Sequence, residues 1–417
     1  MTGLTFFRGS LAPSLEGLEG LTSAGIDVQP ADTHNGEIWA AALRHPTWGR
    51  ARLSAPRKVQ FPLGDLVKFA SGLTDSERVT IEHDAQSALM LEVPSQTNDV
   101  LRDRKDFLRF MAAVLGREGV TGVDLLAQTF WTPGRLSDEL QHSAPLDIIH
   151  IHVLHVVTQP GGTWLHSHGL AEIGYVDFDV LRPNEELTAS QFDLLRSIAF
   201  HIVEGASSGS IEPAVGADPI ALVDAQTFMR SAAPSDTALR DPADHSDRRV
   251  VCCDSGSAGF IGRLFGTKDL RPARLLSRGL TEGKHLIRFS DSATDLTATR
   301  ARESLSLVEP LRTEFAEMKS TALVKLGYPT DSGRSGREHL WFEVHDVKND
   351  HLDATLVNDP FDISSMKVGD RRHHAAELVT DWAIMTPLGQ LTPRSLELAR
   401  KLRELRPKIL EFLRKQA

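Results

Sequence analysis

The segment from His142 to His168 constrains the fold more than any other part of the chain. It holds six of the 17 histidines, and residues 147–157 form an apolar, β-branched run that predicts a strand. The turn sequence QPGG follows, and a second strand is expected around Thr163. Loops of two or of four residues give the same strand register, so the sequence predicts one particular β-hairpin.

In that register His155 lies directly opposite His166, and His168 shares their face because side chains alternate along a strand. Directly opposed Cβ atoms are about 4.5–5.5 Å apart, so two imidazoles can bind one ion. Glu172, Asp177 and Asp179 are the acidic residues nearby in the sequence, and of these Glu172 and Asp177 are the candidate carboxylate ligands. This pattern fits a divalent metal ion as the candidate cofactor. The alternative function is therefore a metal-dependent hydrolase in which the ion lowers the pKa of a bound water.

The favoured interpretation is that these histidines have a structural role on the solvated face of a sheet. No HExxH or CxxC spacing accompanies them. A slip by one residue would place His155 opposite Leu165 or Ser167 and break the cross-strand pair. His150 and His152 are expected on the opposite face of the first strand.

Hydrophobic patterning along the chain predicts an α+β fold with three parts. Residues 1–205 read as a mixed sheet-and-helix domain that contains the histidine-rich hairpin. Residues 206–248 are rich in Gly, Ala, Ser, Pro and Asp, which predicts a flexible, linker-like segment. Residues 249–417 are expected to form a β-meander packed by helices. A basic terminal helix is expected to begin at Pro393 and to be split or kinked at Pro407.

Composition excludes several classes of protein. The chain is 41% apolar and 24% charged, which is typical of globular proteins, and its net charge of −10 argues against a nucleic-acid partner. The two cysteines, Cys252 and Cys253, are adjacent, which disfavours a disulfide and favours a cytoplasmic location. No run approaches the roughly 20 apolar residues of a transmembrane segment.

A glycine-rich segment from Ser255 to Gly262 is similar to the phosphate-binding turn of short-chain dehydrogenases. Gly266 and Pro272 follow too soon for the helix that such a turn requires. A nicotinamide-dependent oxidoreductase is therefore the least favoured alternative.

Four short motifs occur together in the last third of the chain. They are EHLW at 338–341, LVNDP at 356–360, VGD at 368–370 and DW at 381–382. On these motifs residues 321–393 resemble the YegJ-like family, a bacterial domain of unknown function, and the resemblance implies no activity. The stretch from 164 to 179 is similar to one found in uncharacterised bacterial proteins.

The strand expected over residues 338–345 has two different faces. Leu340, Phe342 and Val344 form the predicted core face, whereas the other face mixes an aromatic ring with polar groups, which suits a protein-binding surface. The candidate partner-binding residues are Trp341, Glu343, His345, Asn358, Asp381 and Trp382. Because no nucleophile motif is present, the leading hypothesis is a non-enzymatic bacterial adaptor or neutralising protein whose partner is another protein. The sequence does not specify an oligomeric state.

Overall fold

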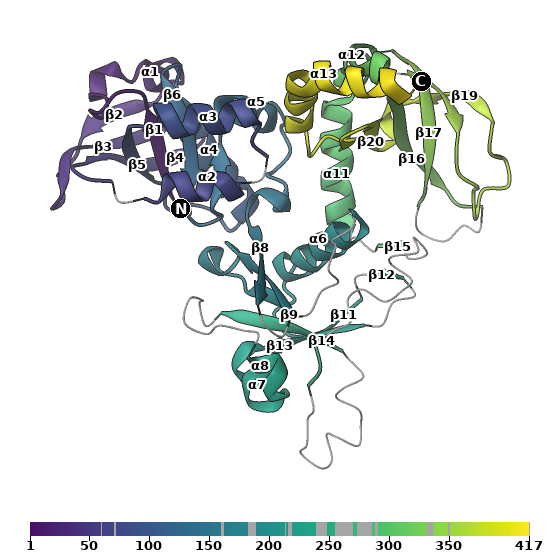
Figure 1. Ribbon diagram of the computed structural model, residues 1–417, viewed down its shortest axis with the longest axis horizontal. Helices are drawn as coiled ribbons and strands as arrows, with labels where there is room; N and C mark the ends of the chain where they lie inside the picture. The colour runs from purple at the N-terminus through teal and green to yellow at the C-terminus, as the bar shows by residue number, and fades with distance from the viewer. Residues whose placement is uncertain are drawn as a thin grey trace.

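The computed structural model describes most of the chain (Figure 1), namely residues 1–59, 61–70, 72–159, 162–181, 189–212, 214–215, 219–238, 248–254, 270–272, 286–287, 291–331, 337–348 and 351–416. Helices and strands occur in both halves of the chain, so the predicted α+β class is confirmed. Among the described helices, none combines the length and the apolar character that a membrane crossing requires. The glycine-rich segment from Ser255 to Gly262 lies outside the described residues.

The first sheet is antiparallel and has the strand order β2-β3-β4-β5-β1-β6-β7. Its strands are β1 (Thr2–Phe7), β2 (Asp27–Pro30), β3 (Glu37–His45), β4 (Gly49–Pro56), β5 (Ser87–Glu92), β6 (Gly119–Asp124) and β7 (Thr129–Trp131). The accompanying helices are η1 (Leu15–Gly17), α1 (Glu19–Ser23), α2 (Leu63–Phe69), α3 (Asp75–Asp84), α4 (Val100–Leu115) and α5 (Pro133–Leu140).

Helix α4 forms where the sequence predicts a helical stripe. The Asp99 side chain caps it by accepting a hydrogen bond from the Arg102 N–H at 3.1 Å, and Gly116 ends it at φ 50°. Phe107 and Met111 are buried in a core between α4 and one face of the sheet, whereas α2 and α3 pack on the other face.

The second sheet has the strand order β11-β13-β14-β10-β9-β8. Its strands are β8 (Val153–Gln159), β9 (Gly162–His168), β10 (Asp177–Leu181), β11 (Gly209–Ile211), β13 (Ile220–Asp224) and β14 (Arg249–Asp254). Only β10 and β14 run parallel, so the sheet is mixed. The nearby helices are η2 (Ile148–His150), η3 (Ala171–Ile173), α6 (Ala189–Val203), α7 (Ala225–Ser231) and α8 (Pro234–Thr237), and a separate strand pair is formed by β12 (Ala214–Val215) and β15 (Leu286–Ile287).

The described part of the segment expected to be linker-like, residues 206–248, differs from that expectation. It contributes β11 and β13 to the second sheet and α7 to one face of it. The physical reason is that β13 pairs with β14 along five residue pairs, so its backbone groups are satisfied within the sheet. Helix α6 supplies Leu195 and Ile198 to the core on the opposite face.

The third sheet is an antiparallel meander with the order β19-β18-β17-β16-β20-β21. Its strands are β16 (Thr321–Pro329), β17 (Arg337–Lys348), β18 (His351–Leu356), β19 (Arg371–Ala375), β20 (Val379–Thr386) and β21 (Gly389–Leu391). Its helices are α11 (Asp291–Glu303), η5 (Leu305–Leu307), α12 (Val308–Phe315), η6 (Ala316–Met318), η7 (Ala376–Leu378) and α13 (Glu397–Gln416). Leu340, Phe342 and Val344 are buried, as the alternation predicts.

The terminal helix differs from the expected one at both of its prolines. It begins at Glu397 and not at Pro393, because Thr392 and Ser395 form a separate turn in which the Thr392 N–H donates to Ser395 Oγ. It also continues through Pro407 without a break.

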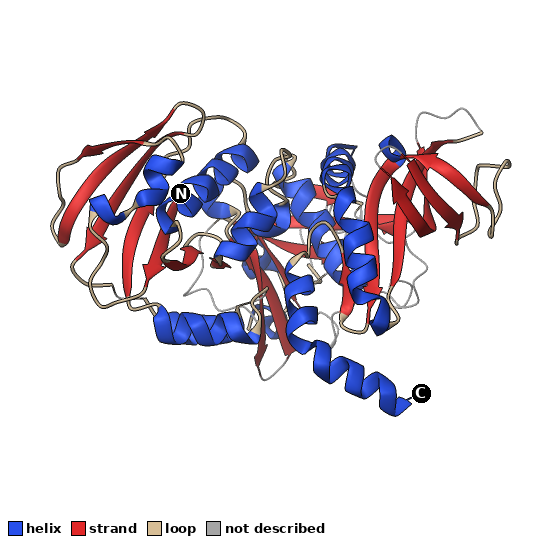
Figure 2. Ribbon diagram, turned by 90° about the horizontal axis from the view of Figure 1, so that it is seen from above, coloured by secondary structure: helices blue, strands red, loops and turns tan. Residues whose placement is uncertain are grey.

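Helix α11 connects the parts of the molecule, and it runs between the second and third sheets (Figure 1). Ala293 belongs to the core shared by the first two sheets, whereas Ala301 belongs to the core of the third. Arg300 on the same helix donates to Glu139 on α5 at 2.6 and 2.5 Å. Helices gather between the first and third sheets in the orthogonal view (Figure 2), so the junction is built from helix surfaces and buried ion pairs.

Candidate functional site

The histidine hairpin forms in the predicted register. His155 on β8 pairs with His166 on β9, Thr158 pairs with Thr163, and the pairing continues without a shift to Gln159. His168 lies on the same face of β9 as His166. Backbone pairing therefore places the three histidines on one face of the second sheet, at the edge formed by β8 and β9.

The three imidazoles converge on one another. A ring nitrogen of each lies within 4.8 Å of one from the others, and the ring centroids are 4.9–5.4 Å apart. His166 is buried, whereas His155 and His168 are half-buried. Burial lowers the pKa of His155, and the neutral ring that results is the form that coordinates metals.

Among the described residues, Trp164 and Asp179 are two neighbours of His166. The Trp164 ring lies 4.1 Å from the His166 ring, centroid to centroid, and the two planes are 35° apart. Asp179 on β10 is the direct cross-strand partner of His166. The buried Arg249 donates to Asp179 Oδ1 from Nε at 3.1 Å and from Nη2 at 2.6 Å. A carboxylate whose charge is balanced by Arg249 thus lies on the strand next to the imidazole cluster.

Asp177, a candidate metal ligand, has other partners in the structure. Its Oδ1 accepts hydrogen bonds from Ser167 Oγ at 2.7 Å and from the Leu170 N–H at 3.2 Å, and its Oδ2 accepts one from the Ala171 N–H at 3.3 Å. These hydrogen bonds satisfy the buried carboxylate, and they fix the backbone just after β9.

Glu172, the other candidate carboxylate, lies in the turn η3, and its side chain is outside the described part of the structure.

His150 and His152 do not share a strand face as expected. Asp147 Oδ1 accepts a hydrogen bond from the Ile149 N–H at 3.2 Å and starts η2, so β8 begins only at Val153. His152 precedes the strand, and its Nδ1 lies 2.8 Å from the Ile148 carbonyl oxygen. Burial lowers the pKa of His152 to about 4.

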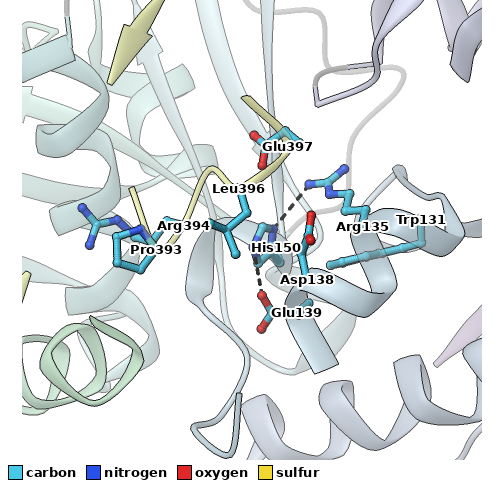
Figure 3. A pocket seen from close by; sticks show the side chains of 9 residues that line it. All are labelled: Trp131, Arg135, Asp138, Glu139, His150, Pro393, Arg394, Leu396 and Glu397. Carbon is cyan, nitrogen blue, oxygen red and sulfur yellow. Dashed lines mark hydrogen bonds and ion pairs between the residues drawn. The ribbon is translucent and has the colours of Figure 1, made fainter. Parts of the chain in front are cut away.

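His150 belongs instead to a charged cluster between α5 and the segment 393–397 that leads into α13 (Figure 3). Its Nε2 lies 3.4 Å from Glu139 Oε2, and its Nδ1 lies 3.4 Å from Arg135 Nη2. Burial acts to raise the pKa of Glu139, but hydrogen bonds from Arg300 and His150 outweigh it and hold that pKa at about 2.

The hollow beside this cluster is small. Its volume of about 10 Å³ holds roughly one water molecule. The residues that line it are Trp131, Arg135, Asp138, Glu139, His150, Pro393, Arg394, Leu396 and Glu397. Sequence reasoning missed this cluster, because no local pattern signals the pairing of Arg300 with Glu139 across 161 residues. The cluster serves to join parts of the fold.

The predicted partner-binding residues on β17 lie on its outward face. Trp341 is half-buried, and the Lys325 Nζ lies 5.6 Å from its ring centroid. Glu343 is exposed, and His345 Nε2 lies 2.7 Å from Thr355 Oγ1.

The other three partner candidates are engaged within the third sheet. Asn358 Oδ1 accepts a hydrogen bond from the Trp341 N–H at 2.7 Å, and Asp381 Oδ2 accepts one from Arg394 Nη2 at 3.0 Å. Trp382 is 0% exposed, and its Nε1 donates to Ser304 Oγ at 2.9 Å. Trp382 is therefore a core residue and not a surface residue, because adjacent strand residues face opposite sides of the sheet.

Comparison with known proteins assigns the C-terminal region alone. Residues 291–391 match the family described as "Uncharacterized protein conserved in bacteria (DUF2314)". No curated protein and no solved structure matches the chain. The match begins 30 residues before the expected boundary at 321, so it includes α11 and α12 as well as the sheet. The C-terminal region of this chain is therefore similar to an uncharacterised family that is conserved in bacteria.

Proposed function

We propose that the protein binds a divalent transition-metal ion, zinc in the first instance, through His155, His166 and His168. The observation that carries this proposal is the convergence of one ring nitrogen from each residue to within 4.8 Å. In a tetrahedral site with metal–nitrogen distances of about 2.0–2.1 Å, ligand nitrogens are roughly 3.4 Å apart. Side-chain rotations that move each ring by about 1 Å would therefore complete the site without a change in the backbone.

The electrostatic surroundings support the proposal. Asp179 is the cross-strand partner of His166, a position from which a carboxylate can accept a hydrogen bond from a metal-binding histidine and raise the basicity of that ligand. Arg249 holds that carboxylate in place through two hydrogen bonds to the same oxygen. Because Arg249 is itself buried, the Asp179 side chain is fixed before any ion binds.

A metal-dependent hydrolase is the catalytic form of this proposal. Three imidazoles leave a fourth tetrahedral position for water, and an ion with such ligands lowers the pKa of that water to about 7. Because Asp177 is satisfied by Ser167 and two backbone N–H groups, the first coordination sphere is assigned to the three histidines.

Elemental analysis of protein purified without chelators tests the proposal. The expected result is near-stoichiometric metal in the wild type and a background level in a His166→Ala variant. His83→Ala is the matched control, because His83 is exposed on α3, and its metal content should equal that of the wild type. Circular dichroism verifies that each variant is folded. Wild-type protein that keeps no zinc after loading and dialysis, or a His166→Ala variant that keeps its metal, contradicts the proposal.

Protein binding by the third sheet is a second candidate function, in keeping with an adaptor role, and a specific observation favours it. Phe361 is 98% exposed, although the chain around it is held firmly. Glu338 accepts hydrogen bonds from the Phe361 and Asp362 N–H groups at 2.5 and 2.8 Å. An ordered segment that holds an aromatic ring in water is typical of a contact residue in a protein interface.

The segment that leads to this exposed ring is hydrogen-bonded to the backbone of Trp341 on β17. Val357, which is 41% exposed, donates its N–H to the Trp341 carbonyl oxygen at 3.0 Å. Capture of a partner from bacterial extract should be lost in a Phe361→Ser variant and retained in Leu11→Ser, since Leu11 is 83% exposed far away in the first 30 residues. Equal capture by both variants would remove this surface from consideration, and metal content serves as an independent readout.

A further inference from the structure

Strand β8 is an edge strand of the second sheet. Among the described strands its neighbour in the sheet is β9, so its other side presents backbone N–H and C=O groups that the sheet does not pair. Such an edge is a template for another strand, and folded proteins protect their edges with charges, prolines, bulges or short length.

The other edge strands of the three large sheets carry these protections. Strand β2 has four residues, among them Asp27 and Pro30. Strand β19 carries Arg371 and Arg372. Strands β7, β11 and β21 are three residues long each.

Strand β8 carries none of them. Its sequence VLHVVTQ contains no charged residue, proline or glycine, and it pairs with β9 along seven residue pairs without a bulge. Val156 is 52% exposed and Val157 is 37% exposed, and these two side chains point to opposite faces of the strand. A long, regular, β-branched edge that is exposed on both faces is a site for strand addition.

We propose that β8 pairs antiparallel with β8 of a second copy of this chain, which joins the two second sheets into one continuous sheet. A two-fold axis requires only one self-complementary surface, and such dimers are the commonest soluble oligomers. Self-pairing of β8 brings no like charges together, whereas self-pairing of the arginine-bearing strand β19 would.

The register of this pairing follows from the strand itself. Val156 is the middle residue of Val153–Gln159, so a two-fold axis through it, perpendicular to the sheet, pairs all seven residues. The two Val156 residues then lie opposite each other, and each His155 lies opposite a Val157 on the same face. The dimer would thereby cover the outer side of each histidine cluster with an aliphatic side chain.

Sedimentation velocity on the full chain tests this inference. The wild type should be a dimer, and a Val156→Lys variant should be a monomer, because two ammonium groups would meet at the axis. Val79→Lys is the matched control, since Val79 is an exposed valine on α3, and it should remain a dimer. A monomeric wild type at its highest soluble concentration, or a Val156→Lys variant that stays dimeric, overturns the inference.

Cysteine cross-linking keeps the test decisive if the lysine variant fails to fold. Opposed Cβ atoms across an antiparallel pair are about 4.5–5.5 Å apart, near the spacing of a disulfide. Oxidised Val156→Cys should yield a covalent dimer and Val79→Cys should not, whereas equal yields would refute the pairing. Zinc content is measured separately on the same variants. The oligomeric state therefore tests this inference, and the zinc content tests the metal-binding proposal, independently of each other.

Discussion

Replacing Arg300 with methionine is expected to destabilise the protein by about 3–5 kcal/mol, the usual cost of removing one partner of a buried ion pair. Arg300 donates from both terminal nitrogens to the two oxygens of Glu139, at 2.6 and 2.5 Å. The two side chains are 1% and 4% exposed, so bulk solvent does not reach the carboxylate. The variant leaves a buried carboxylate with His150, 3.4 Å away, in place of a bidentate partner.

The pH dependence of this loss follows from the pKa of Glu139. In the wild type the hydrogen bonds from Arg300 outweigh burial and hold that pKa at about 2. Without Arg300, burial raises the pKa of the folded protein above the ordinary value of about 4.3, so acid protonates the folded state first. The stability difference from the wild type should therefore shrink as the pH falls from 7 to 5, and Glu139→Gln in the same background should recover part of it.

Urea unfolding followed by tryptophan fluorescence at both pH values measures these differences, and the Trp131 ring lies 5.3 Å from the His150 ring in the same cluster. Arg8→Met is the matched control, because Arg8 and Asp84 form an ion pair with side chains that are 57% and 38% exposed. That control should lose less than about 1 kcal/mol. An Arg300→Met variant that is no less stable than the control, or whose loss grows in acid, refutes the reasoning.

Two further predictions concern single buried positions. The pKa of His152 is about 4 in the folded protein, so the unfolded protein takes up a proton as the pH falls from 7 to 5. This uptake should lower the free energy of unfolding of the wild type by about 2 kcal/mol, and His152→Gln should lack that loss in urea titrations. An unchanged pH dependence in the variant would contradict this. A Cβ at Gly20 would lie 2.2 Å from the Ala113 carbonyl oxygen, so Gly20→Ala should cost about 1–3 kcal/mol or more. In the control Gly17→Ala the nearest contact is an ordinary 3.7 Å, and thermal unfolding should find it close to wild type; equal melting temperatures for the two variants would disprove the clash.

The histidine hairpin could be predicted from the sequence because its determinants are local. The turn sequence between the strands allows loops of two or four residues, and both give the pairing of His155 with His166 that the structure has. The pairing and the two-residue alternation together place His168 beside them. The start of the first strand could not be predicted. The β-branched residues from Ile148 onward are typical of a strand, whereas in the structure Asp147 accepts a hydrogen bond from the Ile149 N–H and begins a turn.

Features that depend on distant pairing escaped sequence reasoning. Strand β13 lies in a segment whose composition suggests a linker, yet 26 residues or more separate it from the residues of β14 that satisfy its backbone. For β20 the alternation shows that Asp381 and Trp382 face opposite sides but not which side is buried. Helix α11, which packs on β20, decides this by covering the tryptophan.

The position of α11 has a consequence for anyone who wishes to isolate the bacterial family's segment. A fragment cut before residue 291 would begin with a helix whose Ala293 and Leu296 belong to the packing of the upstream half. It would also carry Arg300 without the acidic group that neutralises it. The matched segment thus shares part of its packing with the upstream half of the chain. Expression trials should therefore keep α5 and α6 with it, or keep the whole polypeptide.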